Sequence, residues 1–205
     1  MNSAPISFDL VAAAPRLREW ATRAAISYGT YSGINAAIKD AKDKSLPAVH
    51  TADAIRDEMT VLTVIRVFAL LDRSAEVSLQ VVNRFLKQDD AFDRVLDAYT
   101  AGDPPHFRPA AESTCRAAVE SFKSSYQQID WEIHGRLQAF RNGAIAHISL
   151  SEVKALLTYS QLEHFVRLCA RMSADVSMMA SGLNVDPEER LRDAHCPGSA
   201  PMAQN

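Results

Sequence analysis

The chain has 205 residues, of which 47% are hydrophobic and 23% are charged, a composition typical of one soluble globular domain with a sizeable core. Its formal net charge of −3 argues against the broad basic surface with which proteins grip duplex DNA, although a small basic cleft stays compatible with it. Only 7 glycines and 9 prolines occur, so long helices are the default expectation.

The cysteines and the ends of the chain predict a cytoplasmic protein. Cys115, Cys169 and Cys196 show no paired spacing, and the first residues lack the basic and apolar regions of a secretory signal. The most apolar stretch, residues 61–71, is interrupted by Arg66 and is too short to cross a bilayer. No membrane association is therefore expected.

An Ala-rich amphipathic helix is predicted over residues 16–45, ended by Pro47. Its apolar side chains recur at three- and four-residue steps: Leu17, Trp20, Ala24, Tyr28, Tyr31, Ile34 and Ile38. Thr51 is predicted to cap a second helix that runs to about Arg73. Because this helix is apolar on most sides, it is expected in the middle of a helical bundle.

Shorter helices are predicted between residues 76 and 99, the second of them starting at Asp89-Asp90. Residues 100–105, TAGDPP, form the clearest break in the chain.

The segment from Pro109 predicts either one very long helix or two collinear ones. Its apolar positions are Cys115, Val119, Phe122, Tyr126, Ile129, Ile133, Leu137, Phe140 and Ala144. Ser149 or Ser151 is predicted to cap the last helix, and the polar chain after Gly182 is predicted to be disordered. The fold class is therefore all-α, with an N-terminal helix in residues 1–48, a helical domain in 49–182 and a flexible tail in 183–205. Whether the first helix belongs to the bundle core stays open.

Seven residues at the end of the long helical segment carry the strongest chemical signal: Arg141-Asn142-Gly143-Ala144-Ile145-Ala146-His147. Arginine can hold a phosphate bidentately and stabilise developing charge. Histidine can move a proton near neutral pH, and Asn142 can orient the phosphate or a ribose hydroxyl. These are the groups that a metal-free ribonuclease needs.

Helix geometry separates Arg141 from His147 by about 9 Å along the axis and about 120° around it. The two do not share one face, so the spacing favours a composite cleft in which two copies of the helix meet in a dimer. Alternatively, His147 continues the apolar stripe of Phe140 and Ala144 and is a core or interface histidine.

The string FRNGAIAH resembles the Arg-polar-x4-His signature of the HEPN superfamily, which comprises all-helical nucleotide- and RNA-binding domains. The upstream segments LLDR and VSLQVVNRFL look like the abortive-infection (AbiU-like) branch, and the similarity covers roughly residues 50–180. Gly143 departs from the charged or bulky residue often found at its position.

The resemblance implies a metal-independent endoribonuclease of a toxin–antitoxin or phage-defence system. Arg141, Asn142 and His147 would line a cleft at a homodimer interface. There a ribose 2′-hydroxyl would attack the adjacent phosphate and leave a cyclic phosphate. RNA would be the substrate, and an antitoxin or another regulatory protein would control the enzyme. No cofactor is implied.

Asp72 is the candidate supporting carboxylate, placed to hold Arg141 or orient His147; the alternative is a surface residue paired with Arg73 or with solvent. No histidine spacing predicts a metal site, and no nucleotide-binding glycine loop occurs. His134 is expected on an exposed face.

Two other functions stay open. One is a non-catalytic HEPN-like module that binds RNA, a nucleotide or a protein. The other is a helical interaction protein in which Arg141 and His147 are structural. RNA cleavage would separate the enzyme from both.

Overall fold

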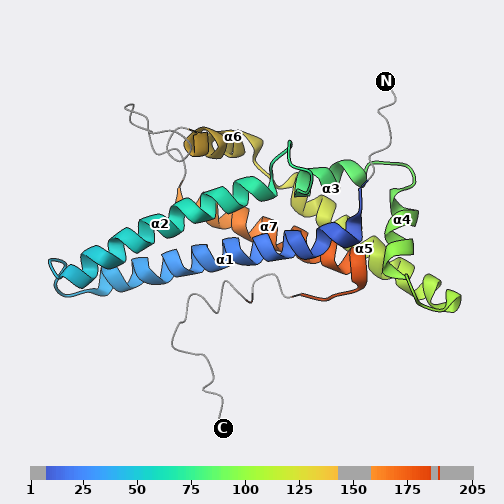
Figure 1. Ribbon diagram of the computed structural model, residues 1–205, viewed down its shortest axis with the longest axis horizontal. Coiled ribbons are helices and arrows are strands. Elements are labelled where there is room, and N and C mark those ends of the chain that lie inside the picture. Colours follow the sequence, from blue (N-terminus) through green and yellow to red (C-terminus); the bar gives the residue numbers. More distant parts are fainter. Residues whose placement is uncertain (1–7, 143–157, 186–188, 190–205) are drawn as a thin grey trace, which may run out of the picture.

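The computed structural model describes residues 8–142, 158–185 and 189, and within these ranges every regular element is a helix. This confirms the predicted all-α fold, a helical bundle with a long N-terminal helix (Figure 1). In chain order the helices are α1 (Leu10–Asp40), α2 (Pro47–Leu70), α3 (Leu79–Phe85), α4 (Ala91–Tyr99), the 3-10 helix η1 (Pro105–Phe107), α5 (Arg108–Gln127), α6 (Trp131–Phe140) and α7 (Tyr159–Ser181).

Helix α1 begins six residues earlier than predicted. Asp9 is its N-cap and accepts a hydrogen bond from the backbone N–H of Ala12 at 2.9 Å. The helix continues through Pro15, whose ring nitrogen cannot donate to the preceding turn. The buried side chains of α1 belong to the same hydrophobic cluster as those of α2 and α7.

The predicted cap at Thr51 is wrong, because α2 starts at Pro47 with Leu46 in the N-cap position. Proline suits the first helical position, where the backbone N–H has no helical partner. The Thr51 hydroxyl lies inside the helix and donates to the carbonyl of Pro47 at 3.1 Å. Helix α1 already ends at Asp40, with Ala41 as its C-cap, so the predicted end near residue 45 is wrong, and Pro47 starts α2 instead of stopping α1.

The sequence predicted that α2 lies in the middle of the bundle, but the central helix is α7. Helix α7 packs against α1, α5, α4, α2 and α3, and Figure 1 shows it running beside α1. Its predicted stripe is buried at Leu162, Phe165, Val166, Cys169, Met172, Val176 and Met179. Only Thr63, Val64, Val67 and Leu70 are buried on α2. The apolar remainder of α2 is partly exposed because it forms a two-helix arm with α1.

The ends of α7 are set by local interactions. Thr158 caps it with a reciprocal capping box to Gln161, whereas Ser149 and Ser151, the predicted caps, lie outside the described residues. At the other end Gly182 adopts the left-handed conformation with φ of 67°. Most of the predicted tail, including residues 190–205, also lies outside the described residues.

The predicted loop at residues 100–105 is present and contains Gly102 with φ of 90°. Asp90 precedes α4 as its N-cap residue, in agreement with the predicted start at Asp89-Asp90. Across the described ranges, no helix is both long enough and apolar enough to span a membrane.

The segment from Pro109 forms two helices, which resolves the alternative that the sequence left open. Asp130 caps α6 and accepts hydrogen bonds from the backbone N–H groups of Glu132 and Ile133 at 2.9 and 3.0 Å. Helix α6 contacts α2 and lies over its C-terminal half (Figure 1). Arg141 and Asn142 continue the chain beyond α6 in π-helical geometry.

Candidate functional site

Arg141 and Asn142 form an exposed pair at the C-terminal end of α6. The Nη1 atom of Arg141 donates to Oδ1 of Asn142 at 2.9 Å. The guanidinium carbon lies 5.3 Å from the ring centroid of Phe68 on α2, within the range of a cation–π contact. The ring therefore holds the guanidinium against α2 while the charged group stays accessible to solvent.

His147 and Gly143 lie outside the described residues, which stop at Asn142 and resume at Thr158. The relation between Arg141 and His147 therefore stays a prediction. The structure brings a different histidine to the pair.

His134 lies beneath the Arg141 contact and was not predicted there. Its ring stacks on Phe68 with centroids 5.8 Å apart and planes 8° apart, and it meets the Trp131 ring edge-on at 5.4 Å. The side chain is only 9% exposed, and among the described residues its Nε2 atom has no hydrogen-bond partner. The expectation that His134 is exposed is wrong because α6 is a new helix after the break at Asp130. In α6, His134 lies on the same face as Leu137, three residues later, and both side chains are buried. The register of the preceding helix does not continue into α6.

Burial lowers the pKa of His134, and the negative charge of Asp72 opposes that shift. At neutral pH the ring is therefore uncharged, with one nitrogen able to donate and the other able to accept. A buried neutral imidazole with an unpartnered nitrogen is uncommon, since such a group loses its hydrogen bond to water without replacement.

Asp72 follows the end of α2 and is half-buried. Its Oδ1 atom accepts hydrogen bonds from the backbone N–H and the hydroxyl of Ser74 at 2.8 and 2.7 Å. Within the described part of the chain it forms no ion pair with Arg141 or Arg73, and its charge acts on His134. Asp72 also lines a cavity of about 280 Å³ with Arg16 and Trp20.

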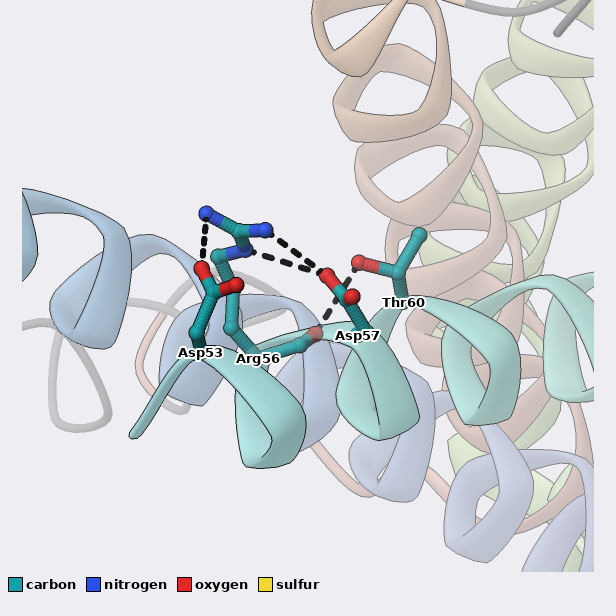
Figure 2. A network of polar contacts seen from close by, with 4 residues as sticks. All are labelled: Asp53, Arg56, Asp57 and Thr60. Carbon is teal, nitrogen blue, oxygen red and sulfur yellow. Dashed lines mark hydrogen bonds and ion pairs between the residues drawn. The ribbon is translucent and has the colours of Figure 1, made fainter. Parts of the chain in front are cut away.

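Arg141 differs from Arg56, an arginine of α2, in its charge environment. Figure 2 shows Arg56 held between Asp53 and Asp57, each at 2.8 Å, while the Thr60 hydroxyl donates to the Arg56 carbonyl. Two carboxylates neutralise that guanidinium. Among the described residues Arg141 has no carboxylate partner, so its charge is available to an anion.

A second cavity, of about 600 Å³, lies between α5 and α7. Ser121 donates there to Asp175 at 3.0 Å, and burial raises the pKa of Asp175 to about 6. Neither Arg141, Asn142 nor Asp72 lines this cavity. Over the ranges that the structure covers, no group of three or more His, Cys, Asp or Glu side chains is arranged to hold a metal ion.

No protein-family model, no curated protein and no solved structure matches this chain. The site itself consists of an exposed arginine–amide pair, the aromatic ring beneath it, and a buried imidazole on which a nearby carboxylate acts.

Proposed function

We propose that the chain is a metal-independent endoribonuclease of a toxin–antitoxin or phage-defence system, with Arg141, Asn142 and His147 as its catalytic residues. The observation that carries the proposal is the exposed Arg141–Asn142 pair, which is held on an aromatic ring and has no carboxylate partner among the described residues. The motif RNGAIAH and its resemblance to HEPN ribonucleases supply the reaction class.

Arg141 binds the scissile phosphate, and its planar guanidinium offers two parallel N–H donors to two phosphate oxygens. As the 2′-hydroxyl attacks, negative charge grows on those oxygens and the interaction strengthens. The amide of Asn142, already hydrogen-bonded to Arg141, orients the phosphate or a ribose hydroxyl. Contact with Phe68 restricts the guanidinium and so reduces the entropy lost when RNA binds.

His147 transfers the protons. As general base it removes the proton of the 2′-hydroxyl, whose oxygen forms a bond to phosphorus; as general acid it protonates the 5′-oxygen that leaves. The products are a 2′,3′-cyclic phosphate and a 5′-hydroxyl. Asp72 is a positioning residue in this scheme, because it acts on the buried His134 that packs against the ring beneath Arg141.

The proposed enzyme is a homodimer, since the helical spacing of Arg141 and His147 suits a cleft built by two chains. A ribonuclease of this kind harms its own host. Control by an antitoxin or by an infection-triggered signal is therefore part of the proposal.

A cleavage assay tests the proposal. Purified protein is incubated with a mixed RNA pool in EDTA, alongside His147→Ala and Arg141→Ala. The matched controls are His106→Ala, in the 3-10 helix η1, and Arg136→Ala, an exposed arginine of α6 that is ion-paired with Glu132. We expect the wild type and both controls to produce 2′,3′-cyclic phosphate ends, and both motif variants to produce none.

Cleavage that survives both motif substitutions would contradict the assignment of the site. RNA binding without cleavage, together with normal growth of cells that express the wild type, would favour the non-catalytic module. Equal melting temperatures of all variants are required, so that loss of activity is not loss of fold.

A further inference from the structure

A row of aromatic side chains crosses the surface between α5, α6 and α2. Tyr126 meets Trp131 with ring centroids 5.4 Å apart, and Trp131 meets His134 at the same separation. His134 stacks on Phe68, whose ring carries the Arg141 guanidinium. Within this row Trp131, the first residue of α6, is the exposed member, with 41% of its surface accessible.

Arginines lie at both ends of the row. At one end, Arg84 and Arg73 lie close enough to Tyr126 for their charges to act on its ring hydroxyl. Burial raises the pKa of Tyr126, and these charges and a hydrogen bond to Asn83 oppose that rise. Arg84 also donates to the backbone carbonyl of Arg73 at 3.3 Å, so the two residues are neighbours. Arg141 stands at the other end. In the described ranges none of the three arginines forms an ion pair with a carboxylate.

The acidic residues beside Trp131 are already engaged. Glu132 forms an ion pair with Arg136, and Asp130 accepts two backbone N–H groups at the positive end of α6. The row therefore carries three arginines that have no ion-pair partner among the described residues. They stand against the carboxylates of Asp130 and of Asp72, whose charge acts on His134, in a chain with a net charge of −3. An exposed ring flanked by unpaired arginines suits a ligand that combines flat bases with phosphates.

We infer that the surface formed by Arg73, Arg84, Trp131 and Arg141 binds single-stranded RNA, with Trp131 as the platform on which a base stacks. This inference rests on the proposed function, since it names the surface that presents RNA to Arg141. Arg73 and Arg84 hold phosphates on one side of the stacked base, and Arg141 holds the scissile phosphate on the other. Duplex RNA is excluded from Trp131 because its bases are already stacked and paired.

Tryptophan fluorescence reads this surface directly. The chain has two tryptophans, so Trp20→Phe leaves Trp131 as the sole tryptophan, which is excited selectively at wavelengths that its five tyrosines do not absorb. The probe is a 2′-O-methylated single-stranded RNA of about ten nucleotides, within the range of known single-strand sites. It cannot undergo 2′-hydroxyl attack, so binding is measured without cleavage. We expect saturable quenching of Trp131 by the single strand. A duplex of the same sequence should bind at least about tenfold more weakly.

Salt dependence then identifies the phosphate contacts. Each contact with a single strand contributes a slope of about −0.7 to log K against log salt. Arg73→Gln/Arg84→Gln should weaken binding and make the slope shallower by about 1.4. The matched control is Arg108→Gln/Arg116→Gln, which changes two exposed, carboxylate-paired arginines of α5 and should leave both values unchanged.

Variants that lack Trp131 cannot be followed by its fluorescence, so stacking is tested with a fluorescently labelled RNA. The anisotropy of the label reports binding. Trp131→Leu should weaken binding about tenfold or more, and Trp131→Phe should restore most of the affinity. Unchanged Trp131 emission at saturation, or equal effects of the two arginine pairs, would overturn the inference. So would Trp131 quenching that depends on protein concentration alone, which would assign the surface to a second copy of the chain. Cleavage is measured separately, so binding without cleavage rejects the proposed function and leaves this surface standing.

Discussion

At the scale of single residues, the shape of the Arg141 side chain is expected to matter as much as its charge. Arg141→Lys keeps the positive charge but loses the planar fork and the stacking on Phe68. We expect cleavage to fall by about 10²-fold or more, because a transition-state contact is lost. Single-turnover cleavage rates check this, with Arg136→Lys on the preceding helix α6 as the control. A rate within a few fold of the wild type would remove bidentate phosphate binding from the mechanism.

The buried imidazole of His134 should make the fold sensitive to acid. Burial depresses its pKa in the folded state, so below about pH 6.5, the usual histidine value, the unfolded chain binds a proton that the folded chain does not. Stability is therefore lost as the pH falls below that value, and the Asp72 carboxylate lessens the loss. His134→Phe keeps a flat ring and removes the unpartnered nitrogen. It should lie within about 1 kcal/mol of the wild type at pH 7 and lose stability less steeply down to pH 5.

Urea unfolding at several pH values measures this difference. The midpoint reports stability, provided that the dependence of the unfolding free energy on urea concentration is the same for both proteins. Asp72→Asn should steepen the acid sensitivity of the wild type. It should have little effect in the His134→Phe background. Parallel curves for the wild type and His134→Phe would mean that His134 is not the group that titrates.

At the scale of elements, the first two motif residues, Arg141 and Asn142, follow the end of α6 as predicted, but the register of that helix was predicted wrongly. The apolar steps from Cys115 to Ala144 continue without a slip, and they conceal the break at residues 128–130. Asp130, a good N-cap residue, was the local signal for a new start. The pattern of Trp131, His134 and Leu137 then follows, with His134 and Leu137 on the buried face. Periodicity identified the helices well, whereas their starts depend on capping contacts such as those of Asp9, Asp130 and Thr158.

Two glycines provide a direct test of helix α6 and of the end of α7. Gly135 lies within α6, and a Cβ added there meets nothing within 4 Å. Gly135→Ala should stabilise the protein by about 0.5–1 kcal/mol, because the unfolded chain loses freedom. Gly182 has φ of 67°, and its added Cβ would lie 3.3 Å from the Tyr99 ring. Gly182→Ala should destabilise by about 1–2 kcal/mol.

Chemical unfolding of the two glycine variants and the wild type gives the comparison. If Gly135→Ala were destabilising, α6 would not be a regular helix at that position. If Gly182→Ala were neutral, the left-handed end of α7 would be wrong.

At the scale of the whole molecule, the sequence predicted the fold class but not which helix is central. Helix α2 is rich in apolar residues, and hydrophobicity alone suggested a central position. Helix α7 has a narrower stripe, but it runs between several neighbours and buries more of its surface. How much of a helix is buried depends on how many other helices pack around it, and the sequence pattern of that helix alone does not show this. For the same reason no pattern within α6 could reveal that Phe68 of α2 lies beneath Arg141.

The proposed dimer makes a quantitative prediction about mixed variants. If Arg141 of one protomer works with His147 of its partner, a heterodimer of Arg141→Ala and His147→Ala has one intact site and one that lacks both groups. Random exchange makes about half of the dimers heterodimers, so the mixture should regain about a quarter of the wild-type activity. Each variant alone should stay inactive. The mass of each sample by light scattering should be about twice the 22.5 kDa of one chain.

The control for complementation mixes Arg141→Ala with the double variant Arg141→Ala/His147→Ala, a pair that cannot build an intact site in either arrangement. Sites contained within one protomer would also give no recovery from the first mixture, since every chain then carries one lesion. Recovery near a quarter therefore requires a cleft shared between two chains. A dimeric mass without recovery would retain the dimer but move the whole site into one protomer. In that case the 120° separation of Arg141 and His147 on a regular helix would have to be closed by a change of backbone geometry, which the π-helical turn at Arg141 and Asn142 already begins.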